Sequence, residues 1–169
     1  MYKHGKCLHI PFLANLNFMI QRIQSVYLLA VAALSTLLLK LPLANLISPK
    51  ASFLYHAIGV NDVATGASVY STLPIFLLLV ATILVSIITI FQFKRRTIQI
   101  RLAIANGVLI LGFYGLFFMY YWLMKDQLMV TLSLRLVFVI PIISFIMNWL
   151  AIRGIKADEA LVKSLDRIR

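Results

Sequence analysis

Four long apolar runs constrain this chain more than any other feature of its sequence. They cover residues 25–43, 73–93, 102–124 and 136–152, and the last three contain no charged residue. At 1.5 Å per residue, and with flanking side chains that snorkel, each run approaches the bilayer's hydrocarbon thickness of about 30 Å. The chain is 62% hydrophobic and 12% charged, so it has too little polar surface to cover a water-facing globule. We therefore expect an all-α membrane protein, a four-transmembrane-helix bundle.

Lysine and arginine are spread unevenly over the segments that flank these runs. The two terminal segments and the connection between the second and third runs carry twelve of these cations, and the other two connections carry four. Cytoplasmic segments are enriched in Lys and Arg, so both termini are expected in the cytoplasm. Tyr120, Tyr121 and Trp122 then fall at the outer end of the third run, where interfacial aromatic residues are typical.

The pattern divides the chain into three parts. Residues 1–18 are expected to be a disordered N-terminal extension, residues 19–152 the transmembrane domain, and residues 153–169 an amphipathic cytoplasmic tail. The tail is either a docking helix for a partner or a helix that lies on anionic headgroups. A cleaved signal peptide that ends near Ala44 is the alternative for the first run. That run is longer than a usual signal-peptide core, and its cleavage would leave an odd number of spans.

The only long connection, residues 44–72, is rich in apolar and β-prone residues. Residues 53–60 and 69–71 are separated by turn formers and predict a short outer β-hairpin, with an irregular interfacial loop as the alternative. Pro141 lies inside the fourth run and is expected to bend it.

The net charge of +11 would indicate nucleic-acid binding in a soluble protein. Here the cations sit at the ends of apolar runs, a pattern typical of membrane topology and contact with anionic lipid headgroups on the cytoplasmic side. We therefore expect no nucleic-acid partner, and a membrane-protein partner or a homo-oligomer fits the architecture. The residues expected near headgroups, or acting only as a topology signal, are Lys94, Arg95, Arg96, Arg101, Arg153 and Lys156.

The sequence shows no catalytic, metal or cofactor constellation. The five acidic residues and the three histidines all lie outside the predicted spans, although proton-coupled transport usually needs a titratable group within the membrane. No HExxH, paired-cysteine or phosphate-binding glycine motif occurs. We expect no enzyme activity and no cofactor.

Two polar residues remain inside the spans. Asn106 lies five residues after Arg101, and Asn148 lies five residues before Arg153. Both should sit about 7 Å from the cytoplasmic interface, at matching depth on antiparallel helices. An interhelical hydrogen bond between them, worth roughly 0.6 kcal/mol, is the interpretation we favour, and a substrate or ion contact is the alternative.

Three stretches resemble one known family: MIQRIQSVYL (residues 19–28), FKRRTIQIRL (residues 93–102) and the tail RGIKADEALVKSLDRIR (residues 153–169). The family consists of bacterial integral-membrane proteins catalogued as domain of unknown function 4293. The resemblance implies four spans and an inner (cytoplasmic) membrane location, but no activity. It also implies that translation begins at Met19, which an intact-mass measurement would test.

The sequence leaves two hypotheses about function. The first is a non-enzymatic accessory, assembly or scaffold component of the inner membrane. The second is a small transporter or channel-like protein whose pathway is lined by Ser35, Thr36, Ser86, Thr89 and the two asparagines. A continuous polar channel would favour the second, and a tightly packed bundle the first.

Overall fold

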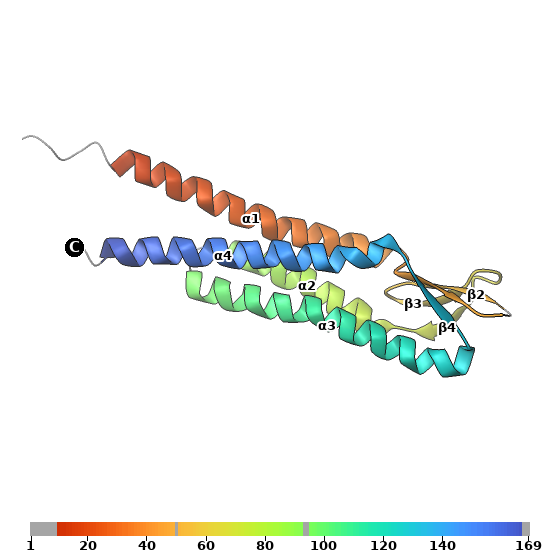
Figure 1. Cartoon of the computed structure of the whole chain (residues 1–169). Helices are drawn as coiled ribbons and strands as arrows, with labels where there is room; N and C mark the ends of the chain where they lie inside the picture. Colours follow the sequence, from red (N-terminus) through yellow and green to blue (C-terminus); the bar gives the residue numbers. More distant parts are fainter. Residues whose placement is uncertain (1–9, 50, 93–94, 167–169) are drawn as a thin grey trace, which may run out of the picture.

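The computed structural model describes residues 10–49, 51–92 and 95–166, and Figure 1 shows an elongated helical bundle with a small sheet at one end. Within these residues the long helices are α1 (Ile10–Lys40), α2 (Leu73–Phe91), α3 (Arg96–Leu128) and α4 (Ile140–Asp166), and a 3₁₀ turn, η1 (Leu136–Val139), precedes α4. We call the end with the strands the sheet end. The opposite end, where α3 begins and α4 ends, is the basic end.

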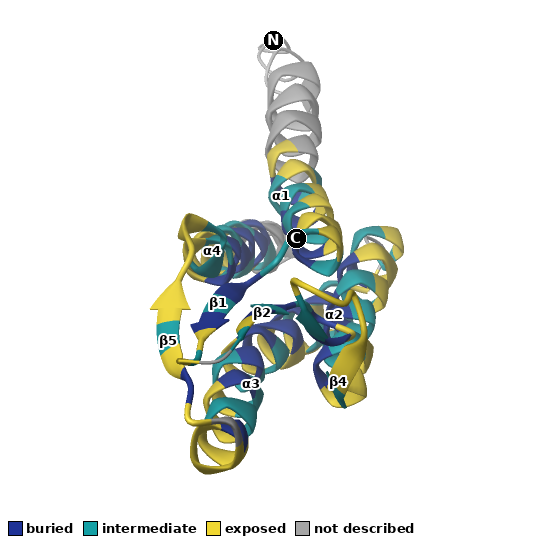
Figure 2. Cartoon of the chain, turned by 90° about the vertical axis from the view of Figure 1, so that its right-hand side faces the viewer, coloured by how far each residue is buried: buried dark blue, intermediate teal, exposed yellow. Residues whose placement is uncertain are grey.

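The four helices form a closed bundle. Helix α1 packs against α2 and α4, and α3 packs against the same two neighbours, so buried residues face a common interior (Figure 2). In the described part of the chain, four stretches are long and apolar enough to cross a membrane: Ile23–Lys40, Leu73–Phe91, Arg96–Gln127 and Leu136–Ala160. The four predicted apolar helices are therefore confirmed.

The interior positions of each helix alternate between spacings of three and four residues. This spacing is the seam of a left-handed bundle, in which side chains interlock between neighbouring helices. Many interior residues are polar, whereas the outward positions are largely apolar, which is the reverse of a soluble bundle. The buried seam residues are Gln24, Leu28, Val31, Ser35 and Leu38 in α1; Ile75, Leu79, Thr82, Ser86 and Thr89 in α2; Gln99, Ala103, Asn106, Ile110, Phe113 and Phe117 in α3; and Pro141, Ser144, Asn148, Ala151, Ile155 and Asp158 in α4.

Prolines account for several helix boundaries. Helix α1 ends at Lys40, three residues earlier than the predicted run, because Pro42 disfavours helical geometry in the residue before it. Pro74 lies in the first turn of α2, where a missing N–H costs nothing. Pro141 is the second residue of α4, directly after the 3₁₀ turn, so within the fourth candidate span it lies where the 3₁₀ turn gives way to the α-helix.

The N-terminal segment also differs from the expectation. Helix α1 already includes residues 10–18, which were expected to be disordered, whereas residues 1–9 lie outside the described residues. Extending a helix that has already nucleated costs little, and residues 10–18 contain Leu and Ala among their helix formers. Figure 1 shows α1 diverging from α4 toward this end. The tail, in contrast, continues α4 without a break to Asp166, and its helical character is confirmed.

The sheet is larger than the predicted hairpin. Five antiparallel strands occur in the order β4-β3-β2-β1-β5, so the all-helical fold class was incomplete. The connection between α1 and α2 supplies β1 (Ala44–Ile47), β2 (Ser52–Tyr55), β3 (Gly59–Asp62) and β4 (Ser68–Ser71). The connection between α3 and α4 supplies β5 (Thr131–Leu134), which pairs with β1. A pairing partner more than eighty residues away leaves no local signal in the sequence.

The two faces of the sheet have different chemistry. Ala44, Leu46, Phe53, Tyr55 and Val60 share one face in register and are buried against the helices. The opposite face carries a cross-strand row in which Ser133, Asn45, Leu54, Asn61 and Ser68 are successive neighbours. This face is mainly amide and hydroxyl, as expected for a sheet with one buried side.

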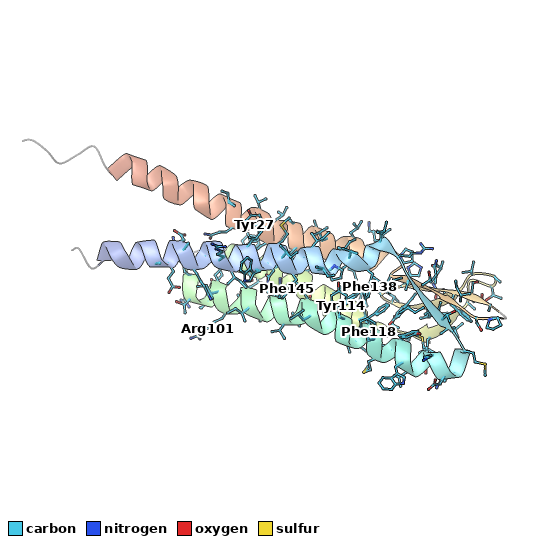
Figure 3. All side chains as sticks on the ribbon, in the orientation of Figure 1. Tyr27, Arg101, Tyr114, Phe118, Phe138 and Phe145 are labelled. Carbon is cyan, nitrogen blue, oxygen red and sulfur yellow. The ribbon has the colours of Figure 1, made fainter. Side chains whose placement is uncertain are left out.

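Aromatic side chains join the sheet to the bundle. The ring of Tyr55 in β2 stacks on Phe117 of α3, with centroids 4.8 Å apart and an interplanar angle of 13°. Phe138 packs against Phe117 at 4.7 Å and against Tyr114 at 5.0 Å, and the Tyr114 hydroxyl donates to the Phe138 carbonyl at 3.0 Å. Figure 3 shows Tyr114, Phe118 and Phe138 gathered where α3 and η1 meet the sheet end.

Candidate functional site

The two asparagines predicted to meet are brought together by the structure. The Asn106 amide nitrogen lies 3.4 Å from the Asn148 side-chain oxygen, and both residues are buried. Asn106 Nδ2 also donates to Ser86 Oγ at 2.9 Å, and Asn148 Nδ2 donates to the Ala103 carbonyl at 2.9 Å. This polar layer therefore ties α2, α3 and α4 together at one depth in the bundle.

A glycine makes room for that layer. A Cβ atom at Gly107 would lie 3.1 Å from Asn148 Nδ2 and 3.7 Å from a ring carbon of Phe145. Because Asn148 is held by its bond to Ala103, the side chain has little freedom to retreat. Helix α4 packs closely on α3 at this point.

Nearer the sheet end, the helices enclose a very small space. It measures about 10 Å³ and is lined by all four helices, with Ser35, Thr82 and Ser144 as its polar groups. A single water needs roughly this volume, so the space fits one water at most. Ser144 Oγ has no hydrogen-bond partner in the described part of the chain, and a water in this space could bind it.

Five of the six residues considered for a transport pathway face the interior: Ser35, Ser86, Thr89, Asn106 and Asn148. Thr36 is exposed and donates to the Ala32 carbonyl at 2.8 Å. Ser86 and Thr89 likewise donate to carbonyls one turn earlier, at 2.8 Å and 2.6 Å.

The cations expected near lipid headgroups lie at the basic end. Arg95, Arg101, Arg153 and Lys156 are exposed, and Arg101 points away from the bundle (Figure 3). The Arg153 guanidinium lies over the ring of the exposed Trp149, 5.8 Å from its centroid. Lys94 lies outside the described residues. These cations therefore occupy one end but do not converge on one point.

Arg96 differs from the other cations at this end. It forms an ion pair with Asp158, whose side chain is 3% exposed. Asp158 was expected in a solvated tail, but it occupies an interior position of α4 within the apolar stretch Leu136–Ala160. The seam spacing of α4 places Asp158 ten residues after Asn148, and this spacing is the signal that the sequence analysis missed. The pair fixes the start of α3 to the end of α4.

Gln24 adds a second buried polar group at the basic end. Its side chain packs on the bare backbone of Gly154, where a Cβ would lie 3.0 Å from Gln24 Cγ. The Gln24 amide nitrogen and the Asp158 Oδ1 atom find no hydrogen-bond partner among the described residues. The sequence analysis missed Gln24 because it lies before the predicted start of the first span.

A larger hollow lies at the sheet end. It is a groove of about 510 Å³ between the last turn of α1 and strands β3 and β4. The lining residues are Leu39, His56, Ile58, Gly59, Asn61, Ser68, Val69, Tyr70 and Ser71. Its volume falls within the range of small-molecule sites, which is roughly 300–1,000 Å³. Sequence reasoning placed several of these residues in hairpin segments but predicted none of them as a site residue, because the groove depends on strand pairing.

The groove has a fixed wall. The His56 backbone N–H donates to the Gly59 carbonyl at 2.9 Å, and Thr72 Oγ1 lies 3.1 Å from the carbonyls of both His56 and Ala57. A Cβ at Gly59 would lie only 2.9 Å from the Tyr70 carbonyl oxygen, so only glycine permits this approach of β3 to β4. The Tyr70 hydroxyl donates to Gln127 of α3 at 3.1 Å. The groove is therefore preformed.

The electrostatic setting of the groove favours a neutral histidine. Burial lowers the pKa of His56, and the nearby Arg135 guanidinium lowers it further. Arg135 is itself oriented by a bond from its Nε to Asn45 Oδ1 at 2.9 Å. Among the described residues, no group of three or more His, Cys, Asp or Glu side chains could hold a metal ion. The groove therefore offers neutral hydrogen-bonding groups, and the Arg135 charge lies outside the residues that line it.

These features define a class: a small protein with four helices long and apolar enough to cross a membrane, polar layers in its interior and a sheet over one end. The chain belongs to the family described as a domain of unknown function, DUF4293, whose model matches residues 20–168. No curated protein matches the chain.

Proposed function

We propose that the chain is an integral protein of the bacterial inner membrane that crosses the bilayer four times and acts as a non-enzymatic accessory, assembly or scaffold component. The basic end lies in the cytoplasm, and the sheet end lies on the outer surface. The unequal distribution of Lys and Arg supports this orientation.

The observation that carries the scaffold proposal is the way the interior is filled. The side chains of Ser86, Asn106 and Asn148 bond to neighbouring helices or to their own backbone, and the space shared by all four helices is about 10 Å³. A transport pathway needs room for a solute, and in this conformation the space fits one water at most.

The basic end supplies the proposed contact with lipids. Arg101, Arg153 and Lys156 are exposed there, at the ends of two candidate spans. Cations near a membrane surface attract anionic headgroups, by about 1 kcal/mol each. Trp149 beneath Arg153 fits an interfacial position, where an amphipathic ring is favoured.

The sheet end supplies a surface for a protein partner. A second hollow, of about 390 Å³, lies on the outer part of α3 and is lined by Met119, Trp122, Leu123, Asp126 and Gln127. Trp122 is 74% exposed. Large exposed aromatic residues are enriched where proteins meet one another.

Crosslinking in native membranes tests this proposal. Exposed lysines mark both ends, Lys125 near the sheet and Lys156 at the basic end, so a lysine-reactive reagent reports which end meets a partner. We expect one stoichiometric partner protein by mass spectrometry. Crosslinks mapped to Lys40 and Lys125 would assign the partner to the sheet end, and the double variant Lys40→Gln/Lys125→Gln should remove them. Crosslinks mapped to Lys156 would assign the partner to the basic end, and Lys156→Gln should remove them. Crosslinks only between copies of this chain would contradict the accessory role and favour an oligomeric transporter.

A further inference from the structure

We propose that the groove at the sheet end binds the phosphate-bearing head of a membrane lipid, whose acyl chains lie along α1 and α2. This inference rests on the proposed insertion of the chain in the membrane, and it adds a lipid site on the face opposite the basic end.

The position of the groove suits a lipid rather than a water-soluble ligand. Leu39 comes from the last turn of α1, and Ser71 precedes the first residue of α2 by two positions. Both helices are candidate spans, and they pack against each other. The groove therefore opens where two spans reach the surface, which is the depth of lipid headgroups. Figure 2 shows β4 in front of the end of α2.

The lining is amphipathic in the way that a lipid requires. Asn61, Ser68, Ser71 and His56 offer hydrogen-bonding side chains, and Leu39, Ile58 and Val69 offer apolar ones. Ile58 is 56% exposed although it borders the groove. Apolar exposure continues onto α2, where Leu73 and Leu77 face outward. The lipid headgroup would thus contact the hydrogen-bonding side chains, and its acyl chains would contact the apolar ones.

The groove contains, among the described residues, no group that would repel an anionic head. No carboxylate lines it, and Arg135 lies near enough to His56 to disfavour a second positive charge there. Lys40 follows Leu39 and is exposed. The nearest acid in sequence, Asp62, belongs to the opposite face, because it pairs with Phe53. Its carboxylate accepts bonds from the Ala64 N–H and the Thr65 hydroxyl, both at 3.0 Å.

The test is photocrosslinking of the full-length protein in detergent. The probe is phosphatidylglycerol with a photoreactive group in its acyl chain near the head, and the crosslinked peptides are mapped by mass spectrometry. We expect crosslinks in residues 56–71. They should be suppressed by excess unlabelled phosphatidylglycerol but not by phosphatidylcholine.

Two matched substitutions separate the groove from general lipid contact. Ser71→Asp places a carboxylate in the groove, and Ser52→Asp places one on the same sheet face, at the end of β2 away from His56 and Arg135. Both serines are exposed, so both variants should fold. We expect Ser71→Asp to reduce crosslinking at residues 56–71 by about tenfold, because like charges in contact repel strongly, and Ser52→Asp to leave it unchanged. Ser68→Trp, which fills the groove without adding charge, should reduce it as well.

Several outcomes would overturn the proposal. Equal competition by phosphatidylcholine, together with no effect of Ser71→Asp, would mean that the crosslinks report only the lipid around any membrane protein. Full competition by soluble glycerol phosphate would assign the groove to a free phosphate compound. Crosslinks confined to residues 95–101 and 153–156 would remove the groove site and leave the proposed function intact. No crosslink at either end would contradict membrane insertion as well.

Discussion

At the scale of residues, several polar side chains lie at interior positions of this bundle, where a soluble protein would place leucine. Asn106 donates to α2 and to α4 from one amide nitrogen. Interhelical bonds of this kind are worth less than their burial suggests, because an unassembled helix finds other partners.

Replacing Asn106 by leucine should therefore weaken the bundle measurably. Asn106→Leu removes the donor to Ser86 and Asn148 while keeping a similar side-chain volume. We expect a loss of about 1 kcal/mol in the free energy of unfolding, measured by thermal denaturation in detergent. Ala105→Leu on the neighbouring exposed position is the control and should leave stability unchanged. Equal stability of the two variants would contradict a structural role for the asparagine layer.

His56 gives the sheet end a pH dependence with a definite sign. Its pKa is lowered in the folded state, so below the ordinary value of about 6.5 the unfolded chain binds this proton more readily. Stability should be greatest above that pH, fall as the pH decreases toward the folded-state pKa, and level off below it. Comparing wild type with His56→Gln between pH 8 and pH 5, about the range in which histidine titrates, isolates this contribution. A histidine signal assigned to residue 56 that titrates at or above the ordinary value by NMR would refute it.

At the scale of elements, the start of α3 is held to α4 by the ion pair of Arg96 and Asp158. Arg96 is 27% exposed and Asp158 only 3%, so the carboxylate depends on its partner more than the guanidinium does. Losing one member of a buried pair leaves an uncompensated charge.

Arg96→Gln should therefore destabilise the chain far more than Arg101→Gln, the matched change at an exposed arginine of the same helix. We expect a loss of about 2 kcal/mol for the former, discounted for its partial exposure, and under about 0.5 kcal/mol for the latter. In an Asp158→Asn background the cost of Arg96→Gln should shrink, since the charge is already gone. The same cost in both backgrounds, measured by thermal unfolding, would show that the two side chains are not coupled.

The helices and strands also show which parts of the fold can be predicted from local sequence. The four apolar helices follow from runs of uncharged residues, and their ends from prolines such as Pro42 and Pro74. Strands β3 and β4 overlap the predicted hairpin segments, but β5 has only four residues, and its partner β1 was assigned to a loop. Pairing over such a distance is decided by tertiary contacts, so neither the sheet nor the groove on it could be predicted.

Candidate site residues could be predicted where two side chains lie at the same depth in neighbouring helices. Asn106 and Asn148 were located because each lies five residues from a charged helix end. Asp158 and Gln24 were missed because both lie beyond the predicted spans, although the three-four spacing of buried positions reaches them. The bundle interior therefore extends further toward the basic end than hydropathy indicates.

At the scale of the whole molecule, the two ends carry different structures. One end carries arginines, the ion pair and the tail of α4, and the other carries a sheet with a hydroxyl- and amide-rich face. A long apolar bundle separates them (Figure 1). Charged ends of this kind do not cross a bilayer readily, so the orientation, once set, should persist.

Labelling of engineered cysteines in intact cells tests this account most directly. Cys7 is the only cysteine, so Cys7→Ser gives a background in which Ala64→Cys marks the sheet end and Lys156→Cys marks the basic end. A membrane-impermeant maleimide should label Ala64→Cys in intact cells, and Lys156→Cys only after the membrane is permeabilised. Labelling of Lys156→Cys in intact cells, or recovery of the chain in the soluble fraction, would contradict the central claim.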